Sequence, residues 1–220
     1  MSAASVVALG PRPTHARRWA QLLLGFVGWG LAVALMIRSG LGLGPWDAFH
    51  VGLHHRLGIG IGTASIAVGG LIVVGSLPLG VRPGIGTLAN MVLIGASIDA
   101  ILPHLPAARG PVWGLVYHLS GIGLAGWFTG MYIAAHLGKG PRDGLVLALA
   151  ERAGWPVRRV RTLIEVGVLG AGWALGGTLG LGTVIYALTI GPSMQWGLRR
   201  WDVLPPTSPA AGARAPRRAA

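Results

Sequence analysis

Two stretches of the chain decide its fold: residues 41–58 read LGLGPWDAFHVGLHHRLG, and residues 137–154 read LGKGPRDGLVLALAERAG. They lie 96 positions apart, and at this offset both carry a G-x-G-P-x-D motif. The same offset aligns the G-x-G-T motif of residues 84–87 with that of residues 180–183, without a gap. Glycines match by chance easily, but two different motifs rarely share one offset, so we infer an internal duplication.

The composition of the chain indicates an integral membrane protein. Of its 220 residues, 52% are hydrophobic and only 11% are charged. Soluble domains contain roughly 25% charged residues, and disordered chains combine low hydrophobicity with high charge, so both classes are excluded. The sequence has no cysteine, which excludes disulfides, thiolate metal sites and thiol nucleophiles. The net charge of +12 is distributed between apolar stretches, so we expect no nucleic-acid partner.

Apolar stretches of the chain predict six transmembrane helices. A helix needs about 20 residues to cross a bilayer. Trp19–Ile37 and Gly110–Leu137 each supply one uncharged span. Residues 57–98 and 166–198 are each too long for one crossing, so we expect two spans in each, with turns near residues 79–84 and 176–182. The result is an all-α membrane fold with three spans in each repeat.

The predicted organisation has four parts and a defined orientation. The parts are a basic cytoplasmic N-terminus (1–18), a first three-span repeat (19–103), a second three-span repeat (111–198) and a basic, disordered cytoplasmic tail (199–220). With both termini inside, fifteen Lys and Arg residues fall in inner loops and only Arg38, Arg56 and Arg109 fall outside, as the positive-inside rule requires. Because three is an odd number, the second repeat enters the membrane from the opposite side, which gives inverted repeats.

Each G-P-x-D motif predicts the start of a short helix. Gly44 and Gly140 suit the N-cap, Pro45 and Pro141 the first helical position, and Asp47 and Asp143 the third position, where a carboxylate accepts backbone N–H bonds. Helices of this length do not span, so they are interfacial or re-entrant. In the first case the aspartates only cap helices. In the second, they face a cavity from opposite sides of the membrane as proton or cation sites.

Other polar residues are candidates for a binding site, each with a structural alternative. Glu165 lies inside the fifth predicted span, where an ionisable group indicates function, although Arg161 four residues earlier is placed to form a simple ion pair with it. Thr87, Thr183 and Asn90 are placed to line a central site or to serve helix packing.

Two sets of residues receive a structural interpretation. The remaining motif residues, Gly84, Gly86, Gly180 and Gly182, are expected to be structural. We expect His118 to mark a membrane interface. Asp47, His50 and His54 share a helical face, but the second repeat lacks the histidines, so we expect no metal site.

The sequence carries no G-x-S-x-G, H-E-x-x-H or Walker-type motif, so we expect neither an enzyme nor a cofactor. On its G-x-G-P-W-D, R-P-G-I-G-T-L-A-N and G-x-G-P-R-D motifs and the Arg161–Glu165 segment, the chain resembles the YczE/YyaS/YitT-like bacterial membrane proteins, in their shorter YczE-like form. The resemblance covers about residues 19–198 and implies a multi-pass protein of the bacterial cytoplasmic membrane, without an established activity.

Two functional hypotheses follow. The first is a secondary permease in which Asp47, Asp143, Glu165 and the G-x-G-T turns surround a cavity for a small molecule or ion. The second is a non-transporting accessory protein that supports an export or biosynthetic system. Its partner would then be another membrane protein or, in a homodimer, a second copy. The lipid bilayer is a partner in both.

Overall fold

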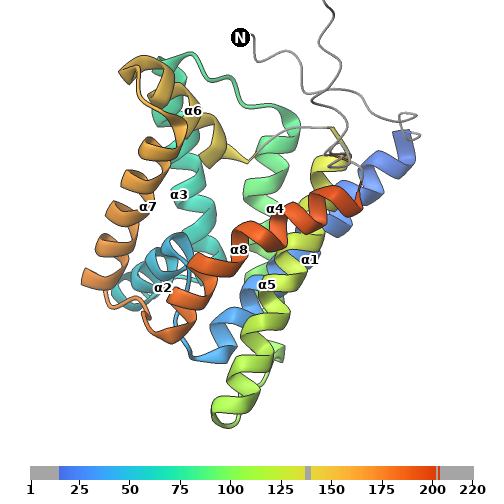
Figure 1. The fold of residues 1–220 in the computed structure, drawn as a ribbon, viewed down its shortest axis with the longest axis vertical. Coiled ribbons are helices and arrows are strands. Elements are labelled where there is room, and N and C mark those ends of the chain that lie inside the picture. The colour runs from blue at the N-terminus through green and yellow to red at the C-terminus, as the bar shows by residue number, and fades with distance from the viewer. Residues whose placement is uncertain (1–14, 137–139, 202, 204–220) are drawn as a thin grey trace, which may run out of the picture.

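The computed structural model describes residues 15–136, 140–201 and 203 (Figure 1). In this part of the chain the secondary structure is helical: α1 (His15–Ser39), α2 (Pro45–Leu57), α3 (Ile61–Ser76), α4 (Ile85–Ile101), α5 (Gly110–Ala134), α6 (Pro141–Ala153), α7 (Val157–Ala174) and α8 (Leu181–Arg200), with short 3₁₀ turns η1 (Leu77–Leu79) and η2 (Leu102–His104). Most of the predicted N-terminal segment and disordered tail, residues 1–14 and 204–220, lies outside the described residues.

The helix boundaries follow the 96-residue offset found in the sequence. The pairs α2 and α6, α3 and α7, and α4 and α8 each begin 96 positions apart. Both short helices begin with proline and end at a glycine in the left-handed region, Gly58 at φ 67° and Gly154 at φ 66°, where a side chain is disfavoured. Equivalent sequence therefore begins equivalent helices in the two halves.

Helices α1 and α5, which hold equivalent positions in the two halves, pack against each other and run antiparallel. The Arg18 side chain donates to the Ala135 carbonyl at 2.8 Å near one end of the pair. At the other end, Gly114 lies against the Ser39 carbonyl. Between them, Trp29 Nε1 donates to Thr129 Oγ1 at 2.8 Å. The two helices therefore pack along nearly their full length.

Close contacts between the central helices occur in reciprocal pairs. Gly25 of α1 packs against Tyr132 of α5, and its equivalent Gly121 packs against Met36, the equivalent of Tyr132. Glycine permits this approach because a Cβ atom at either position would collide with the facing helix.

The outer pair α4 and α8 repeats the pattern. Gly30 of α1 lies against Ser97 of α4, and the equivalent Gly126 of α5 lies against Ser193 of α8. The Ser193 hydroxyl also donates to the Ile122 carbonyl at 2.7 Å. Helices α1, α4, α5 and α8 thus form one tightly packed core.

The two halves differ in how their remaining helices pack. Gly62 of α3 and Gly95 of α4 place the two backbones in direct contact. Asp99 of α4 accepts hydrogen bonds from the Gly62 and Thr63 N–H groups at 2.6 and 2.8 Å and from the Thr63 hydroxyl at 2.8 Å. Within the described residues, α7 makes no comparable packing with α8, and Figure 1 shows α7 standing apart from it.

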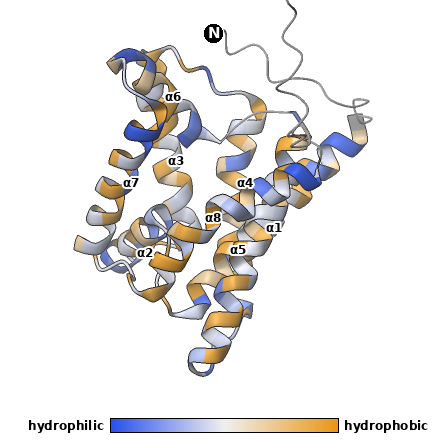
Figure 2. Cartoon of the chain, in the orientation of Figure 1, coloured by the Kyte–Doolittle hydropathy of each residue, from blue (hydrophilic) through white to orange (hydrophobic). Residues whose placement is uncertain are grey.

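The surface of the helices suits a lipid environment. Large apolar side chains lie exposed on α3, α4, α5, α7 and α8, among them Leu71, Ile85, Val112, Trp173 and Leu188. Figure 2 shows hydrophobic residues along the helices and hydrophilic ones at the start of α1 and around the turn between α6 and α7. The chain is therefore an all-α membrane protein whose exposed helix faces contact the bilayer.

Three segments in the described part are long and apolar enough, by length and composition, to cross a membrane: Ala16–Ser39, Ile61–Leu79 and Ile85–His104. Helix α5 has 25 residues and no charged side chain, but its glycines and polar aromatic residues reduce its hydropathy. Six spans therefore remain a prediction from the sequence.

The reciprocal glycine contacts yield a testable prediction. Gly126→Ala places a methyl group against Ser193 and should reduce the free energy of unfolding by about 1–3 kcal/mol through overpacking. Gly123→Ala on the same helix meets no neighbouring atom within 4 Å and should be neutral or slightly stabilising. Thermal unfolding of the two variants in detergent checks this, and equal losses would contradict the packing.

Candidate functional site

The first turns of α2 and α6 meet inside the protein. The guanidinium carbon of Arg142 lies 4.4 Å from the centre of the Trp46 ring, a cation–π distance. Trp46 and Arg142 occupy the variable position of the two G-P-x-D motifs, 96 residues apart. The duplicated motifs therefore contact each other through equivalent residues.

A buried polar chain continues from this contact into α2. Arg142 Nη2 lies 3.4 Å from His50 Nε2, and His50 Nδ1 lies 3.9 Å from Asp47 Oδ1. Because a guanidinium only donates, His50 accepts at Nε2 and its ring proton is directed to Nδ1, on the side of Asp47. Asp47 is 6% exposed and His50 is 1% exposed. Helix α2 is thus not a surface helix, since protein encloses its N-terminal half.

Arg142 is a site residue that sequence reasoning missed. The charge count that predicts the topology places it among the inner-loop cations. Its side chain instead turns inward and is only partly exposed. The sequence signal that could have identified Arg142 is its position in the second G-P-x-D motif. At the equivalent position the first motif has Trp46, whose ring pairs well with a guanidinium.

The predicted pair Asp47 and Asp143 is not brought together, and the two carboxylates differ in environment. Asp143 is exposed and lines a pocket of about 300 Å³ between α5, α6 and α7. The other lining residues are Tyr132, Ile133, Gly140, Val146, Leu147, Val157 and Arg161. We call this cavity the α5–α7 pocket. Its lining includes two of the residues predicted from sequence to bind a ligand, Asp143 and Arg161, and the motif residue Gly140.

Glu165 forms the simple ion pair that its spacing from Arg161 predicts. Arg161 Nε donates to Glu165 Oε1 at 2.9 Å, and the two side chains are 55% and 38% exposed. Glu165 does not line the α5–α7 pocket. Its contribution to that pocket is therefore indirect, through the position of Arg161.

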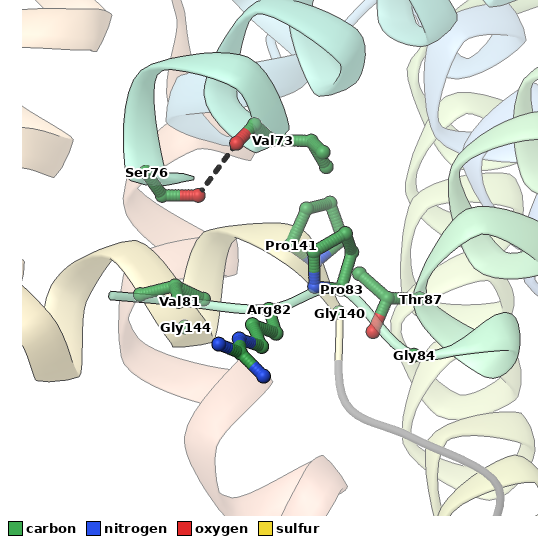
Figure 3. A pocket seen from close by; sticks show the side chains of 10 residues that line it. All are labelled: Val73, Ser76, Val81, Arg82, Pro83, Gly84, Thr87, Gly140, Pro141 and Gly144. Atoms are coloured by element: carbon green, nitrogen blue, oxygen red, sulfur yellow. Dashed lines mark hydrogen bonds between the residues drawn. The ribbon is translucent and has the colours of Figure 1, made fainter. Parts of the chain in front are cut away.

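A second pocket, of about 240 Å³, lies between the loop before α4 and the start of α6 (Figure 3). Its lining includes the predicted residues Thr87, Gly84, Gly140 and Pro141, together with Arg82. Gly140 borders both pockets, so the second G-P-x-D motif separates them.

The remaining predicted residues lie where the motifs meet α4 and α8. Asn90 of α4 faces Gly140, and its equivalent Tyr186 of α8 faces Gly44. Thr183 Oγ1 accepts the Gly180 N–H at 3.2 Å and closes the first turn of α8, which is a structural role. Gly180 and Gly182 pack against the backbone of residues 41–42, and the Gly182 N–H donates to the Leu41 carbonyl at 2.7 Å.

His118 does not mark an interface, contrary to the sequence-based expectation. Its side chain is fully buried, with Nδ1 3.3 Å from the Ser39 hydroxyl and Nε2 2.9 Å from the Gly182 carbonyl. It joins α5 to the end of α1 and to the second G-x-G-T motif. His54 Nδ1 lies 2.6 Å from the Ile59 carbonyl, and no group of three His, Asp or Glu side chains in the described residues is placed to hold a metal.

Comparison with known proteins assigns relatives but no chemistry. Residues 16–199 match a family described as "Family of unknown function (DUF6198)". The chain is 41% identical over 187 residues to the "Uncharacterized membrane protein YczE" of Bacillus subtilis, covering 82% of this chain and 85% of that protein. It is 34% identical over 169 residues to an "Uncharacterized protein" of Haemophilus influenzae, covering 77% and 78%.

A more distant relative is the "Uncharacterized protein YyaS" of Bacillus subtilis, 24% identical over 159 residues and covering 70% of this chain and 79% of that protein. The predicted resemblance to YczE and YyaS is thus confirmed. The prediction of a membrane protein of bacterial type is confirmed with it. No solved structure matches the chain significantly.

The polar chain predicts coupling between the two motifs. Arg142→Gln leaves the buried Asp47 carboxylate without its cation and should reduce the free energy of unfolding by about 1–3 kcal/mol. In the Arg142→Gln, Asp47→Asn double variant the loss should be smaller than the sum of the single losses, because the unpaired charge is gone. Arg152→Gln, at the exposed end of the same helix, is the control. Additive losses in thermal unfolding would show that the residues do not interact.

Proposed function

This chain belongs to the DUF6198 family, and we propose that it is a secondary permease for a small solute, built from two inverted three-span repeats with both termini in the cytoplasm. The proposal includes the re-entrant form of α2 and α6. Its support comes from the reciprocal contacts between the two halves and from the difference in burial between their equivalent residues.

The reciprocal contacts support the inverted arrangement. A contact between one residue and the equivalent of another recurs with the roles exchanged, as for Gly25 with Tyr132 and Gly121 with Met36. Such pairs are expected when a two-fold axis relates two halves. Because the equivalent helices α1 and α5 run antiparallel, the axis is perpendicular to them and lies in the plane of a membrane that they cross.

The position of the short helices supports a binding site at the repeat interface. Helices α2 and α6 both direct their N-termini to the interior, where Trp46 meets Arg142. Irregular backbone at membrane depth is tolerated where protein or a water-filled cavity surrounds it. In secondary transporters, interrupted helices with this arrangement supply the substrate site.

The observation that carries the proposal is that equivalent residues are buried in one half and accessible in the other. Val51 is 5% exposed and its equivalent Leu147 is 44% exposed. Ile61 is 7% exposed and its equivalent Val157 is 45% exposed. The buried Asp47 likewise corresponds to the exposed Asp143. One site is closed and its counterpart is open, as alternating access requires of two inverted repeats.

This asymmetry assigns a direction to the opening. The α5–α7 pocket is lined by Val157 and Arg161 from the first two turns of α7, next to the basic turn between α6 and α7, which the positive-inside rule places in the cytoplasm. The described conformation is then the inward-open one. In the outward-open one, α3 separates from α4, Asp47 becomes accessible and α7 moves toward α8.

The accessory role keeps one supporting observation. The glycine contacts of α1, α4, α5 and α8 form a closely packed core of the kind expected in a structural membrane subunit. The same core also serves a permease as a fixed scaffold. The accessory role does not account for the burial difference between equivalent residues.

The proposal predicts a change in solute exchange that depends on Asp143. Cells that express the chain should take up or release at least one solute at a rate that differs from cells with an empty vector. Asp143→Asn should remove the difference at equal membrane abundance, because the amide has nearly the same shape as the carboxylate but carries no charge. Glu151→Gln, an exposed acid on the same helix outside the pocket, should retain it.

The measurement is a time-resolved comparison of solutes in the medium and in the cells. An identical profile with and without the chain would contradict the permease and leave the accessory role.

A further inference from the structure

The α5–α7 pocket has mostly apolar walls and contains one acidic and one basic side chain. Ile133, Val146, Leu147 and Val157 make most of the lining apolar. Asp143 enters from the first turn of α6, and Arg161 enters from α7. An apolar cavity with a few placed polar groups is the usual form of a small-molecule site.

The acid in this pocket is available to a ligand. Asp143 is exposed, and it forms no ion pair within 4.0 Å with any residue in the part of the chain that the structure describes. It lies at the third position of α6, so its carboxylate is fixed to a helix and not to a mobile loop. A carboxylate held beside apolar walls favours an ammonium group as its partner.

The Arg161 guanidinium is partly engaged by Glu165 and partly available to a ligand. Glu165 accepts only the Nε proton of Arg161, and a guanidinium carries four more N–H donors in a planar fork. The Arg161 side chain is 55% exposed, although it lines the pocket. The ion pair with Glu165 holds the guanidinium in place, and its remaining donors match the geometry of a carboxylate.

Asp143 and Arg161 line one cavity without contacting each other. We propose that the α5–α7 pocket binds a small zwitterion of amino-acid type with an apolar body, its ammonium group at Asp143 and its carboxylate at Arg161. The site rests on the proposed permease, for which it supplies the substrate class. The apolar body lies against Leu147 and Val157.

The two opposite charges in the α5–α7 pocket favour a zwitterion over an ion of one sign. An amine leaves the free donors of Arg161 without an acceptor, and a carboxylate leaves Asp143 without a donor. Each charged hydrogen bond contributes about 1.5–3 kcal/mol, which is roughly tenfold or more in affinity. A ligand with both groups therefore binds at least about tenfold more tightly than either half of it.

Calorimetric titration of the purified full chain in detergent tests the substrate class. The probes are two zwitterions, L-leucine with adjacent charges and 6-aminohexanoate with separated charges. Each is compared with the amine that lacks its carboxylate and the acid that lacks its amino group. We expect one zwitterion or both to bind, with at least about tenfold higher affinity than the corresponding halves.

Variants connect the binding to the two residues. Asp143→Asn should reduce zwitterion affinity about tenfold or more, as should the Arg161→Gln, Glu165→Gln pair, which removes the base without leaving an unpaired charge. Glu151→Gln on α6 removes one negative charge outside the pocket, as Asp143→Asn does inside it, and Glu151→Gln combined with Arg158→Gln on α7 is net neutral, as the pocket pair is; both controls should bind as the unchanged chain does. A melting curve for each variant verifies that it is folded.

Three results would overturn the inference: no binding of either zwitterion, equal or tighter binding of a half, or unchanged affinity in the pocket variants. Failure of the permease is a different result. In that case a zwitterion binds in the titration, but proteoliposomes that contain the chain show no counterflow of it.

Discussion

A thirteen-residue helix in a membrane protein must find protein partners for its ends, because hydrocarbon offers no hydrogen bonds to free backbone groups. Helices α2 and α6 meet this requirement by turning their first residues toward each other and toward the long helices. The Leu43 N–H donates to the Thr178 carbonyl at 3.1 Å, Gly44 packs on Tyr186, and Arg142 covers Trp46. Glycine is needed at position 42 because its backbone contacts that of Gly180, and at position 44 because the Tyr186 ring occupies the space of a side chain.

The same constraint explains why the two halves resemble each other and where they differ. Close approach of α3 to α4 depends on Gly62 and Gly95, and Asp99 then caps the first turn of α3. At the equivalent positions the second half has Arg158, Gly191 and Gln195, so one glycine and the carboxylate cap are missing. Helix α7 does not pack against α8 as tightly as α3 packs against α4, and the α5–α7 pocket opens beside α7. A small difference in sequence thus produces one closed and one open half.

Much of the fold is readable from the sequence, because duplication and apolar length are properties of the chain itself. The offset between the G-P-x-D motifs places α2 and α6 and locates the turns before α4 and α8. Burial and pairing are not readable in the same way. Arg142 looks like any loop cation until its partner is known, and Arg161 and Glu165 share a helix turn whether or not they serve a ligand.

His118 shows the limit most clearly. Its sequence position near one end of an apolar stretch indicates an interface, and only the packing of α5 against residues 39 and 182 buries it. Asp99 is similar, because its role depends on the N-terminus of α3, 36 or 37 residues away in the chain. Sequence therefore predicts which elements exist, whereas the site depends on contacts between segments far apart in the chain that no local pattern encodes.

The central claim is that one three-span unit is used twice in opposite orientations. The chain has no cysteine, so single cysteines at Arg56 and Arg152, which are exposed and equivalent in the two repeats, can be labelled without background. A membrane-impermeant maleimide added to intact cells should label Arg56→Cys directly and Arg152→Cys only after the membrane is permeabilised. Labelling of both from the same side would contradict the inverted repeat and the permease that depends on it.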